Sequence, residues 1–271
     1  MVSTDFVVVT NAAEAARPNF VTQVASAAYS RVLSSFRSRT PIDSRLAEHP
    51  ATQVAYAALN QLLNTEGKFF SGTVVDEYLK VLKSEYNDRF CYSNKGVIHL
   101  PHAEIPPFEI AKELHQVVRD NDQITDIAIP YDNRGHHIVI YVHRPSRKVE
   151  YYDPQGARSA DGATSRGLAF SMRRQIEQIA ELFFGESYHI AENTSCHQLC
   201  LWRCAIWGLY YIEHRLLHIS AEELQARTID SSALDVYRKQ TMAQKIEQSA
   251  RAALAAADLE ESCTCILVAD D

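Results

Sequence analysis

The chain has 271 residues, of which 46% are hydrophobic and 9% aromatic, so it can bury a sizeable core and is not expected to be disordered. Its formal net charge of −7 argues against general nucleic-acid binding, and no apolar run reaches the roughly eighteen residues that a membrane span needs. The first ten residues lack a basic region followed by a long apolar stretch. They are typical of a strand and not of a signal peptide, so the protein is expected to be intracellular.

The first half of the chain is predicted to be helical. Apolar and small residues recur at helical spacing in several segments, and prolines separate these segments. Pro41 and Pro50 lie in the break between the first two helices, and paired prolines precede the fourth. The four predicted helices cover residues 19–37, 50–64, 73–86 and 107–119.

The middle of the chain is predicted to form strands. Two apolar runs, 124–130 and 136–143, are separated by Asn133-Arg-Gly, which is typical of a turn, and a third run covers 149–152. The pattern after them predicts a helix over 163–184, a short strand over 188–191, a buried helix over 201–217, a helix over 243–257 and a last strand over 263–268. Helices at both ends with strands in the middle indicate an α+β fold.

Four polar residues have the types and the chain order that thiol catalysis requires. A cysteine that attacks a carbonyl needs a base for its proton, an orienting group for that base and a donor to the oxyanion. Cys204 has Gln198 six residues upstream and Asp153 fifty-one residues upstream, and His136 stands seventeen residues before Asp153. Taken singly, these residues could be a buried structural cysteine, a surface glutamine, a turn aspartate before Pro154 and an ordinary histidine.

This order and spacing resemble the ubiquitin-like-protease family, the clan CE cysteine peptidases that include SUMO proteases and bacterial and viral enzymes. In that family a His begins a strand, an Asp follows a Tyr or Phe, and Gln-x5-Cys begins a buried helix. The segment from Asp126 to Asn133 resembles the strand before the His, and residues 70–79 resemble an early helix. The resemblance covers roughly residues 66–215. It implies a papain-like fold, with a central mixed sheet, a buried helix carrying the Cys, and flanking helices.

The resemblance also implies residue roles and a domain division. Cys204 would be the nucleophile, His136 the base, Asp153 its orienting partner and Gln198 an oxyanion donor. The neighbouring residues His137, Trp202 and Arg203 would contact the substrate. The protease domain would cover 66–271, and residues 1–65 would be a helical extension that either captures substrate or caps the core.

Three positions depart from the family pattern. His137 replaces the Trp that usually follows the catalytic His, Arg203 replaces the Asp usually found before the Cys, and Ala205 replaces the Gly after it. These positions affect substrate fit and local packing more than formation of the nucleophile.

The function implied is a cysteine isopeptidase that cleaves after the C-terminal Gly-Gly of ubiquitin or a ubiquitin-like protein, without a cofactor. Ubiquitin is favoured, because a compact chain with a helical N-terminal addition looks like the bacterial effector branch, whose members are secreted into the host cytoplasm without a cleavable signal peptide. Three alternatives stay open: a SUMO-specific protease, an effector acetyltransferase that uses the same Cys and His, and a binding module that kept the fold.

Cysteine usage and local charge carry two further expectations. The six cysteines are interpreted as free thiols, and a zinc site built from Cys196, Cys200 and Cys204 with His214 and His218 is not favoured, because one helix could not hold all three cysteines. Residues 221–271 hold ten acidic and five basic residues, a net of −5. This segment is interpreted as a solvated face, with an acidic docking surface for a basic partner as the alternative.

Overall fold

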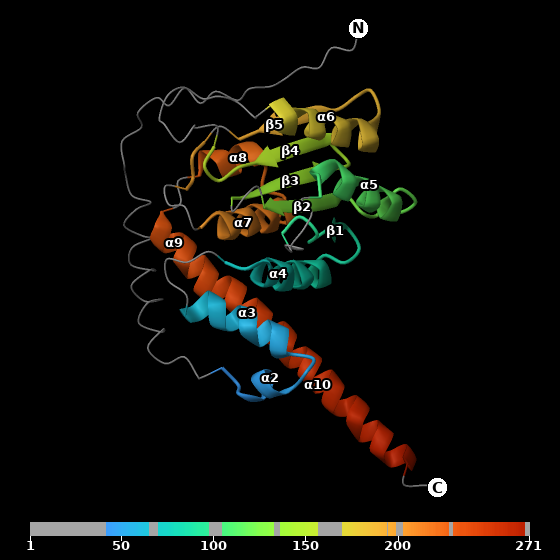
Figure 1. The fold of residues 1–271 in the computed structure, drawn as a ribbon, viewed down its shortest axis with the longest axis vertical. Helices are drawn as coiled ribbons and strands as arrows, with labels where there is room; N and C mark the ends of the chain where they lie inside the picture. Colours follow the sequence, from blue (N-terminus) through green and yellow to red (C-terminus); the bar gives the residue numbers. More distant parts are fainter. Residues whose placement is uncertain are drawn as a thin grey trace.

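The computed structural model describes residues 42–64, 70–97, 105–132, 136–156, 170–193, 195–198, 203–227 and 230–268, with only the backbone path at 170–171 and 260–268. Within these ranges the fold is α+β, as predicted, with one five-stranded mixed sheet flanked by helices (Figure 1). The helix predicted over 19–37 lies outside the described residues. None of the helices described is long and apolar enough to cross a lipid bilayer.

The sheet has the strand order β1-β2-β3-β4-β5. Its strands are β1 (Phe90–Tyr92), β2 (Asp126–Asp132), β3 (His137–His143), β4 (Lys148–Tyr152) and β5 (His189–Glu192). The two outer pairs are parallel, and β2, β3 and β4 are antiparallel, with Val139 opposite Tyr152. This register puts the start of β3 and the end of β4 at the same end of the sheet. His136 and Asp153, one residue beyond these two ends, are therefore brought close together.

Helices surround the sheet on both faces. Those before the long β2–β3 hairpin are α2 (Arg45–Glu48), α3 (Gln53–Asn64), α4 (Gly72–Glu85) and α5 (Pro107–Val118). Those after it are α6 (Phe170–Phe184), α7 (Cys204–Leu216), α8 (Ala221–Ala226), α9 (Ser231–Val236), a π-helical turn (Tyr237–Met242) and α10 (Ala243–Val268).

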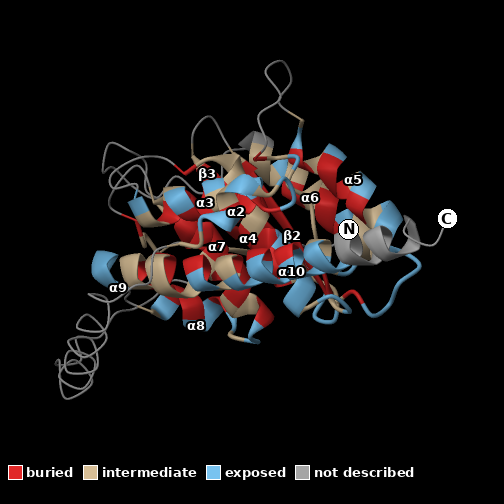
Figure 2. Ribbon diagram, turned by 90° about the horizontal axis from the view of Figure 1, so that it is seen from below, coloured by how far each residue is buried: buried red, intermediate tan, exposed pale blue. Residues whose placement is uncertain are grey.

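Alternating side chains of the strands supply two separate hydrophobic clusters. On one face, Ile129, Ile140 and Val149 pack with residues of α5 and α6. On the other, Val139 and Tyr152 pack with residues of α7, and the same cluster continues into α3, α4 and α10, which Figure 1 shows on that side of the sheet. Figure 2 shows the buried residues gathered between the helices. The α7 helix is thus enclosed between the sheet and a helical layer, as a buried helix carrying the Cys was predicted to be.

The last predicted strand is wrong. Residues 263–268 belong to α10, which runs without a break from Ala243 to Val268. Cys, Ile and Val favour strands only weakly on their own, because a strand is stabilised mainly by its neighbours in a sheet. An existing helix gains one hydrogen bond for each residue that it adds, so the alanine-rich helix continues through this segment.

Several short elements were not predicted, namely α2, β1, α8, α9 and the π-helical turn. Each is three to six residues long. Segments of that length hold too few turns or alternations to give a periodic signal, and their formation depends on the larger elements beside them.

The helices α2 and α3 are part of the main core. Leu46, Leu59 and Leu62 are completely or almost completely buried, and they belong to the cluster formed by α4, α7 and α10. A domain boundary at residue 65 stays a prediction. The packing of residues 42–64 favours the cap among the two roles expected for the N-terminal extension.

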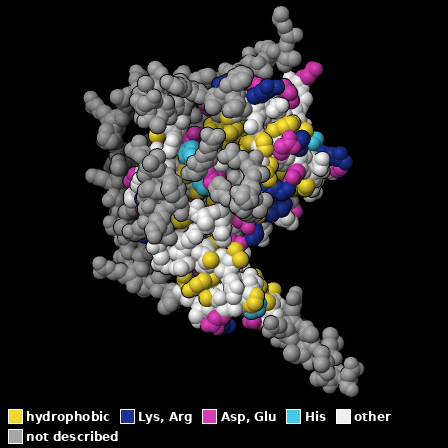
Figure 3. Space-filling view, viewed as in Figure 1, with side chains coloured by type: hydrophobic (Ala, Val, Ile, Leu, Met, Phe, Trp, Pro, Cys, Tyr) yellow, Lys and Arg dark blue, Asp and Glu magenta, His cyan; other side chains and the backbone are white. Residues whose placement is uncertain are grey.

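Several acidic side chains of the C-terminal segment are held in ion pairs. Glu222 pairs with Lys148 at 2.6 Å, Glu223 with Arg227 at 2.9 Å, and Glu247 with Arg251 at 2.8 Å. Figure 3 shows acidic and basic side chains close to one another on the face that it presents. The described part of the segment thus fits a solvated, charge-paired face better than a uniform acidic docking surface.

Candidate active site

His136 and Asp153 meet at the end of the sheet, as the strand register requires. The Nε2 atom of His136 lies 2.6 Å from Oδ1 of Asp153, and both side chains are about one-fifth exposed. The same carboxylate oxygen accepts a hydrogen bond from the backbone N–H of Gln155 at 2.8 Å. Because the carboxylate is fixed by its own turn, it can hold the imidazole in one orientation.

Cys204 completes the contact from the other side of the imidazole. It is the first residue of α7, its side chain is almost fully buried, and its thiol lies near enough to His136 to raise the pKa of the imidazole. The N-terminal end of a helix carries partial positive charge, which favours an anion such as a thiolate. The structure therefore brings together three of the four residues predicted from the spacing, in the order Cys204, His136, Asp153.

The environment keeps His136 protonated. Burial alone disfavours the imidazolium and lowers its pKa, but the hydrogen bonds and charges of Asp153 and Cys204 outweigh burial and raise the pKa of His136 to about 10. At neutral pH the His136 imidazole is thus protonated, with the Asp153 carboxylate and the Cys204 thiol as its two neighbours. This is the charge arrangement expected of a thiolate–imidazolium pair held by a carboxylate.

Gln198 lies on a loop that is attached to the Asp153 turn. Its side chain is 3% exposed. The backbone N–H groups of His197 and Gln198 both donate to the carbonyl of Pro154, at 2.9 and 2.8 Å. The loop therefore sits against the turn through two backbone hydrogen bonds, and Gln198 enters the interior on the same side of the molecule as the Asp153 turn.

Gly156 permits the close approach of turn and loop. Its φ is +67°, and a Cβ built on it would lie 2.8 Å from the carbonyl oxygen of Ser195. A larger residue would have both a strained backbone and a clash with this carbonyl.

The three residues expected to contact substrate are placed differently from the catalytic candidates. His137 is buried on the α7 face, 4.0 Å from Asp132 in its Nε2–Oδ2 distance, and it lines a small internal cavity with Ala205 and Gly208. Arg203 precedes α7 and is held by Asp235 at 2.9 Å and by the Ser231 carbonyl at 3.0 Å. Trp202 lies outside the described residues.

The comparisons with known proteins concern the fold. No family model matches the chain, and no curated protein sequence is similar to it. Solved structures do match. A protease of ASFV aligns with a TM-score of 0.53 and 15% identity, over 80% of this chain and 88% of that one. The SUMO protease Ulp1, crystallised with its catalytic cysteine oxidised to a sulfonic acid, aligns with a TM-score of 0.50 and 12% identity, over 74% of this chain and 95% of that one.

A third match is the Ulp1 protease domain in complex with Smt3, the yeast orthologue of SUMO. It has a TM-score of 0.50 and 11% identity, and the alignment covers 79% of this chain and 99% of that one. The chain has the fold of the SUMO protease Ulp1. At these identities the likeness concerns the arrangement of the elements, and the roles of individual residues depend on the geometry described above.

Two residues that spacing along the chain does not single out lie beside the site. Asn193 follows β5, and its side chain forms hydrogen bonds with both the backbone N–H and the backbone carbonyl of Asp153. His197 lies between the rings of Tyr152 and Trp207, with centroid distances of 5.8 and 5.3 Å, and burial lowers its pKa. Sequence spacing gives no signal for either residue, since each acts through contacts that only the folded chain makes.

Several of the candidate zinc ligands have other partners in the structure. The His, Cys, Asp and Glu side chains that the structure describes form no group of three or more able to hold a metal ion. Cys204 contacts His136, and His214 stacks on Tyr210 with its Nδ1 2.9 Å from the Tyr210 carbonyl. Cys200 lies outside the described residues.

Proposed function

We propose that this protein is a cysteine isopeptidase that removes ubiquitin or a ubiquitin-like modifier by cleavage after the modifier's C-terminal Gly-Gly. The observation that carries the proposal is the contact chain from Cys204 through His136 to Asp153 at the head of a buried helix, on a fold shared with cysteine proteases. Neither the fold nor the three residues alone would carry it, because folds host several functions.

In the proposed first step the thiol proton resides on His136, and the Cys204 sulfur attacks the carbonyl carbon of the modifier's last glycine. The tetrahedral intermediate places negative charge on the former carbonyl oxygen. The backbone N–H of Cys204 and the side-chain amide of Gln198 are the proposed donors to this oxygen, and loss of one such donor typically slows turnover on the order of 100-fold.

The intermediate then collapses. The C–N bond breaks, and His136 gives its proton to the leaving lysine amine, which leaves a thioester between the modifier and Cys204. A water molecule loses a proton to His136 and attacks the thioester. Collapse expels the Cys204 thiolate, releases the modifier's carboxylate with one proton to solvent, and regenerates the thiolate–imidazolium pair. Asp153 keeps the imidazole in the orientation that both steps require.

The choice of modifier is the finer part of the proposal. One Ulp1 structure of similar fold is a complex with Smt3, the yeast orthologue of SUMO, which supports a ubiquitin-like protein as the substrate class. A glycine-glycine tail suits a narrow channel that larger side chains could not enter. We propose ubiquitin as the preferred member, and the assignment to secreted effectors in a host cytoplasm stays a prediction.

The test uses ubiquitin, SUMO and other ubiquitin-like proteins that carry a thiol-reactive group at the C-terminus. We expect the ubiquitin probe to label wild-type protein at Cys204. Cys204→Ala should not be labelled, whereas Cys196→Ala, which removes a half-buried free cysteine of the Gln198 loop, should be labelled as wild type. Labelling by the SUMO probe alone would change the modifier, and labelling by none would overturn the proposal.

A further inference from the structure

The Asn193 side chain is almost completely buried at the end of β5, and its polar atoms face backbone groups of the candidate site. Its Oδ1 accepts the N–H of Asp153 at 2.7 Å, and its Nδ2 donates to the Asp153 carbonyl at 2.7 Å. Nδ2 also lies 3.1 Å from the Ser195 carbonyl, to which it donates. We propose that Asn193 is a positioning residue of the reaction, which fixes Asp153 for His136 and joins the Asp153 turn to the Gln198 loop.

The side-chain amide of Asn193 extends the hydrogen bonding of the sheet beyond the last backbone pair of β4 and β5. The N–H of Asn193 donates to the Tyr151 carbonyl at 3.2 Å, as the parallel pairing of β4 and β5 requires. At Asp153, the Asn193 side chain takes the place of a strand backbone. It accepts a hydrogen bond from the Asp153 N–H and donates one to the Asp153 carbonyl. The backbone of Asp153 is therefore held one residue beyond the end of β4.

Only an asparagine fits these three contacts at this length. One oxygen must accept from an N–H, and one NH2 group must donate to two carbonyls. An aspartate would place its second oxygen against both carbonyl oxygens, and an alanine would remove all three hydrogen bonds, after which the Asp153 carbonyl would keep the hydrogen bond from the Gly156 N–H. Leaving a buried donor or acceptor unsatisfied is costly, which makes the arrangement specific for the amide.

The hydrogen bond from Asn193 to the Ser195 carbonyl connects Asn193 to the loop that carries Gln198. Ser195 is the residue whose carbonyl packs against Gly156, and the loop after it donates twice to Pro154. Asn193 thus lies at the point where the turn carrying Asp153 and the loop carrying Gln198 are joined. It contacts neither Cys204 nor His136 in the hydrogen bonds described, so its effect on the reaction passes through Asp153 and the loop.

The inference rests on the proposed function for its kinetic test, which compares wild type, Asn193→Ala, Asp153→Asn and the double variant. We expect Asn193→Ala to lower kcat about tenfold, with KM within about twofold, because a displaced orienting group weakens the chemical step and not substrate binding. In the Asp153→Asn background the same change should slow the reaction by clearly less than tenfold, since the part of the effect that passes through the Asp153 carboxylate is already lost and only the part that passes through the Gln198 loop remains.

Asn94→Ala is the matched control, because Asn94 is a half-buried amide bonded to Asp76 and outside the hydrogen bonds of the site. It should keep wild-type kinetics. If Asn193→Ala does not fold, Asn193→Ser serves in its place, since it keeps a small polar group at this position that is too short to make all three contacts. A wild-type kcat in the folded Asn193 variant, or a full additional loss in the double variant, overturns the inference.

A second measurement separates this inference from the proposed function. The rate at which iodoacetamide alkylates Cys204 reports its thiolate and needs no substrate, and mass spectrometry of the Cys204 peptide distinguishes it from the other cysteines. We expect this rate to fall several-fold in Asn193→Ala and to stay unchanged in Asn94→Ala. An unreactive wild type toward every modifier probe, combined with this fall, would overturn the proposed function and leave the role of Asn193 intact. An unchanged rate would overturn the role of Asn193.

Discussion

The two faces of the sheet are built from alternate residues of the same strands, yet they differ in chemistry. The face toward α5 and α6 is lined with aliphatic side chains such as Ile129, Ile140 and Val149. The face toward α7 carries buried carboxylates among its aromatic residues. Glu150 accepts from Tyr211 at 2.7 Å and from Arg215 at 2.8 Å.

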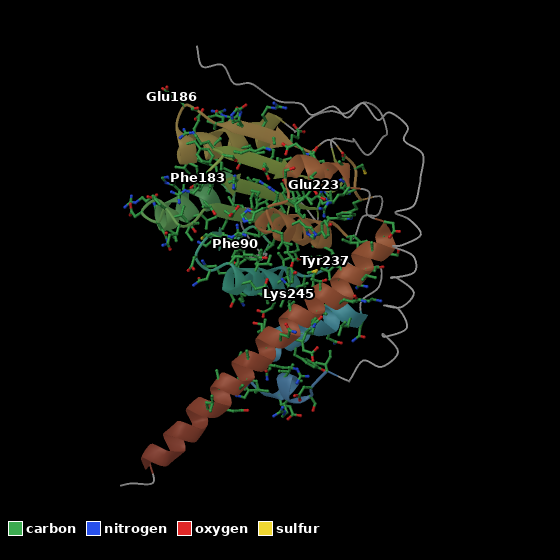
Figure 4. All side chains as sticks on the ribbon, turned by 180° about the vertical axis from the view of Figure 1, so that it is seen from behind. Phe90, Phe183, Glu186, Glu223, Tyr237 and Lys245 are labelled. Atoms are coloured by element: carbon green, nitrogen blue, oxygen red, sulfur yellow. The ribbon has the colours of Figure 1, made fainter. Side chains whose placement is uncertain are left out.

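A second buried carboxylate, Glu213, lies on α7 itself. It accepts from the hydroxyls of Tyr78 at 2.9 Å and Tyr237 at 2.5 Å, and Lys245 is 2.8 Å away. Figure 4 shows Tyr237 and Lys245 at the level where α10 passes α7. One carboxylate thus ties together α4, α7, the π-helical turn and α10.

The two faces of the sheet therefore hold their helices in different ways. Aliphatic packing holds the α5–α6 layer on the sheet without fixing directions, because the hydrophobic effect is non-directional. Hydrogen bonds to buried carboxylates fix the position and rotation of α7, and the first residue of α7 is Cys204. We infer that the polar network keeps the nucleophile at the distance that His136 and Asp153 need.

The strongest way to break the α7 face is to remove the two N-terminal helices that pack on α4 and α10. A chain that starts at residue 66 lacks α2 and α3, whose Leu46, Leu59 and Leu62 are buried in the core. We expect it to aggregate and to be inactive on both peptide and full-length substrates, because a large apolar surface becomes exposed. A chain that starts at residue 42 keeps both helices and is the control. A soluble, folded and active product from residue 66 would return these helices to the role of substrate capture.

Substitutions of the adjacent residues His136 and His137 should separate a catalytic role from a structural one. His136→Ala should lower kcat about a thousandfold or more, because base and nucleophile act as one unit. His137→Ala should mainly lower the melting temperature, since His137 is buried on the α7 face and lines an internal cavity. Steady-state kinetics and thermal unfolding of both variants check this. A rise in KM for His137→Ala at unchanged stability would instead support its predicted contact with the substrate tail.

Loss of the Glu213 carboxylate should lower the free energy of unfolding more than truncation of an aliphatic side chain on the opposite face. Glu213→Ala should lower the free energy of unfolding by about 3 kcal/mol, because it leaves the two buried hydroxyls of Tyr78 and Tyr237 without their carboxylate acceptor. Ile179→Val, on the α6 layer, should lower it by about 1 kcal/mol. Urea unfolding measures both. Equal effects would mean that the polar network contributes no more than ordinary packing.

A last expected effect is the pH dependence that His136 adds to stability. Its pKa is about 10 in the folded protein against about 6.5 for an ordinary histidine, so folding favours the protonated form. This contribution is fully present below about pH 6.5 and is lost as the pH rises toward about 10. Wild type should therefore lose more stability than His136→Gln between these pH values, as urea unfolding at each pH would show. Parallel loss in both proteins would contradict the raised pKa.

Much of the fold was predictable because its larger elements repeat a simple pattern. The helix predicted over 73–86 is α4, the one over 107–119 is α5, and the three central strands lie within two residues of their predicted bounds. These segments are long or strongly alternating, so local periodicity and burial agree. The strand over 263–268 failed for the opposite reason, since no neighbouring strand supports it and the preceding helix does.

The chain by itself determined the order and spacing of Cys204, Gln198, Asp153 and His136, because spacing is a property of the covalent chain. Only the tertiary structure decided that three of these side chains touch, that His137 faces the interior, and that Arg203 pairs with Asp235. It also brought in Asn193, which is forty residues from Asp153 along the chain and 2.7 Å from its backbone. Contacts of this kind depend on strand register and on the packing of α7, and neither leaves a periodic signal in the sequence.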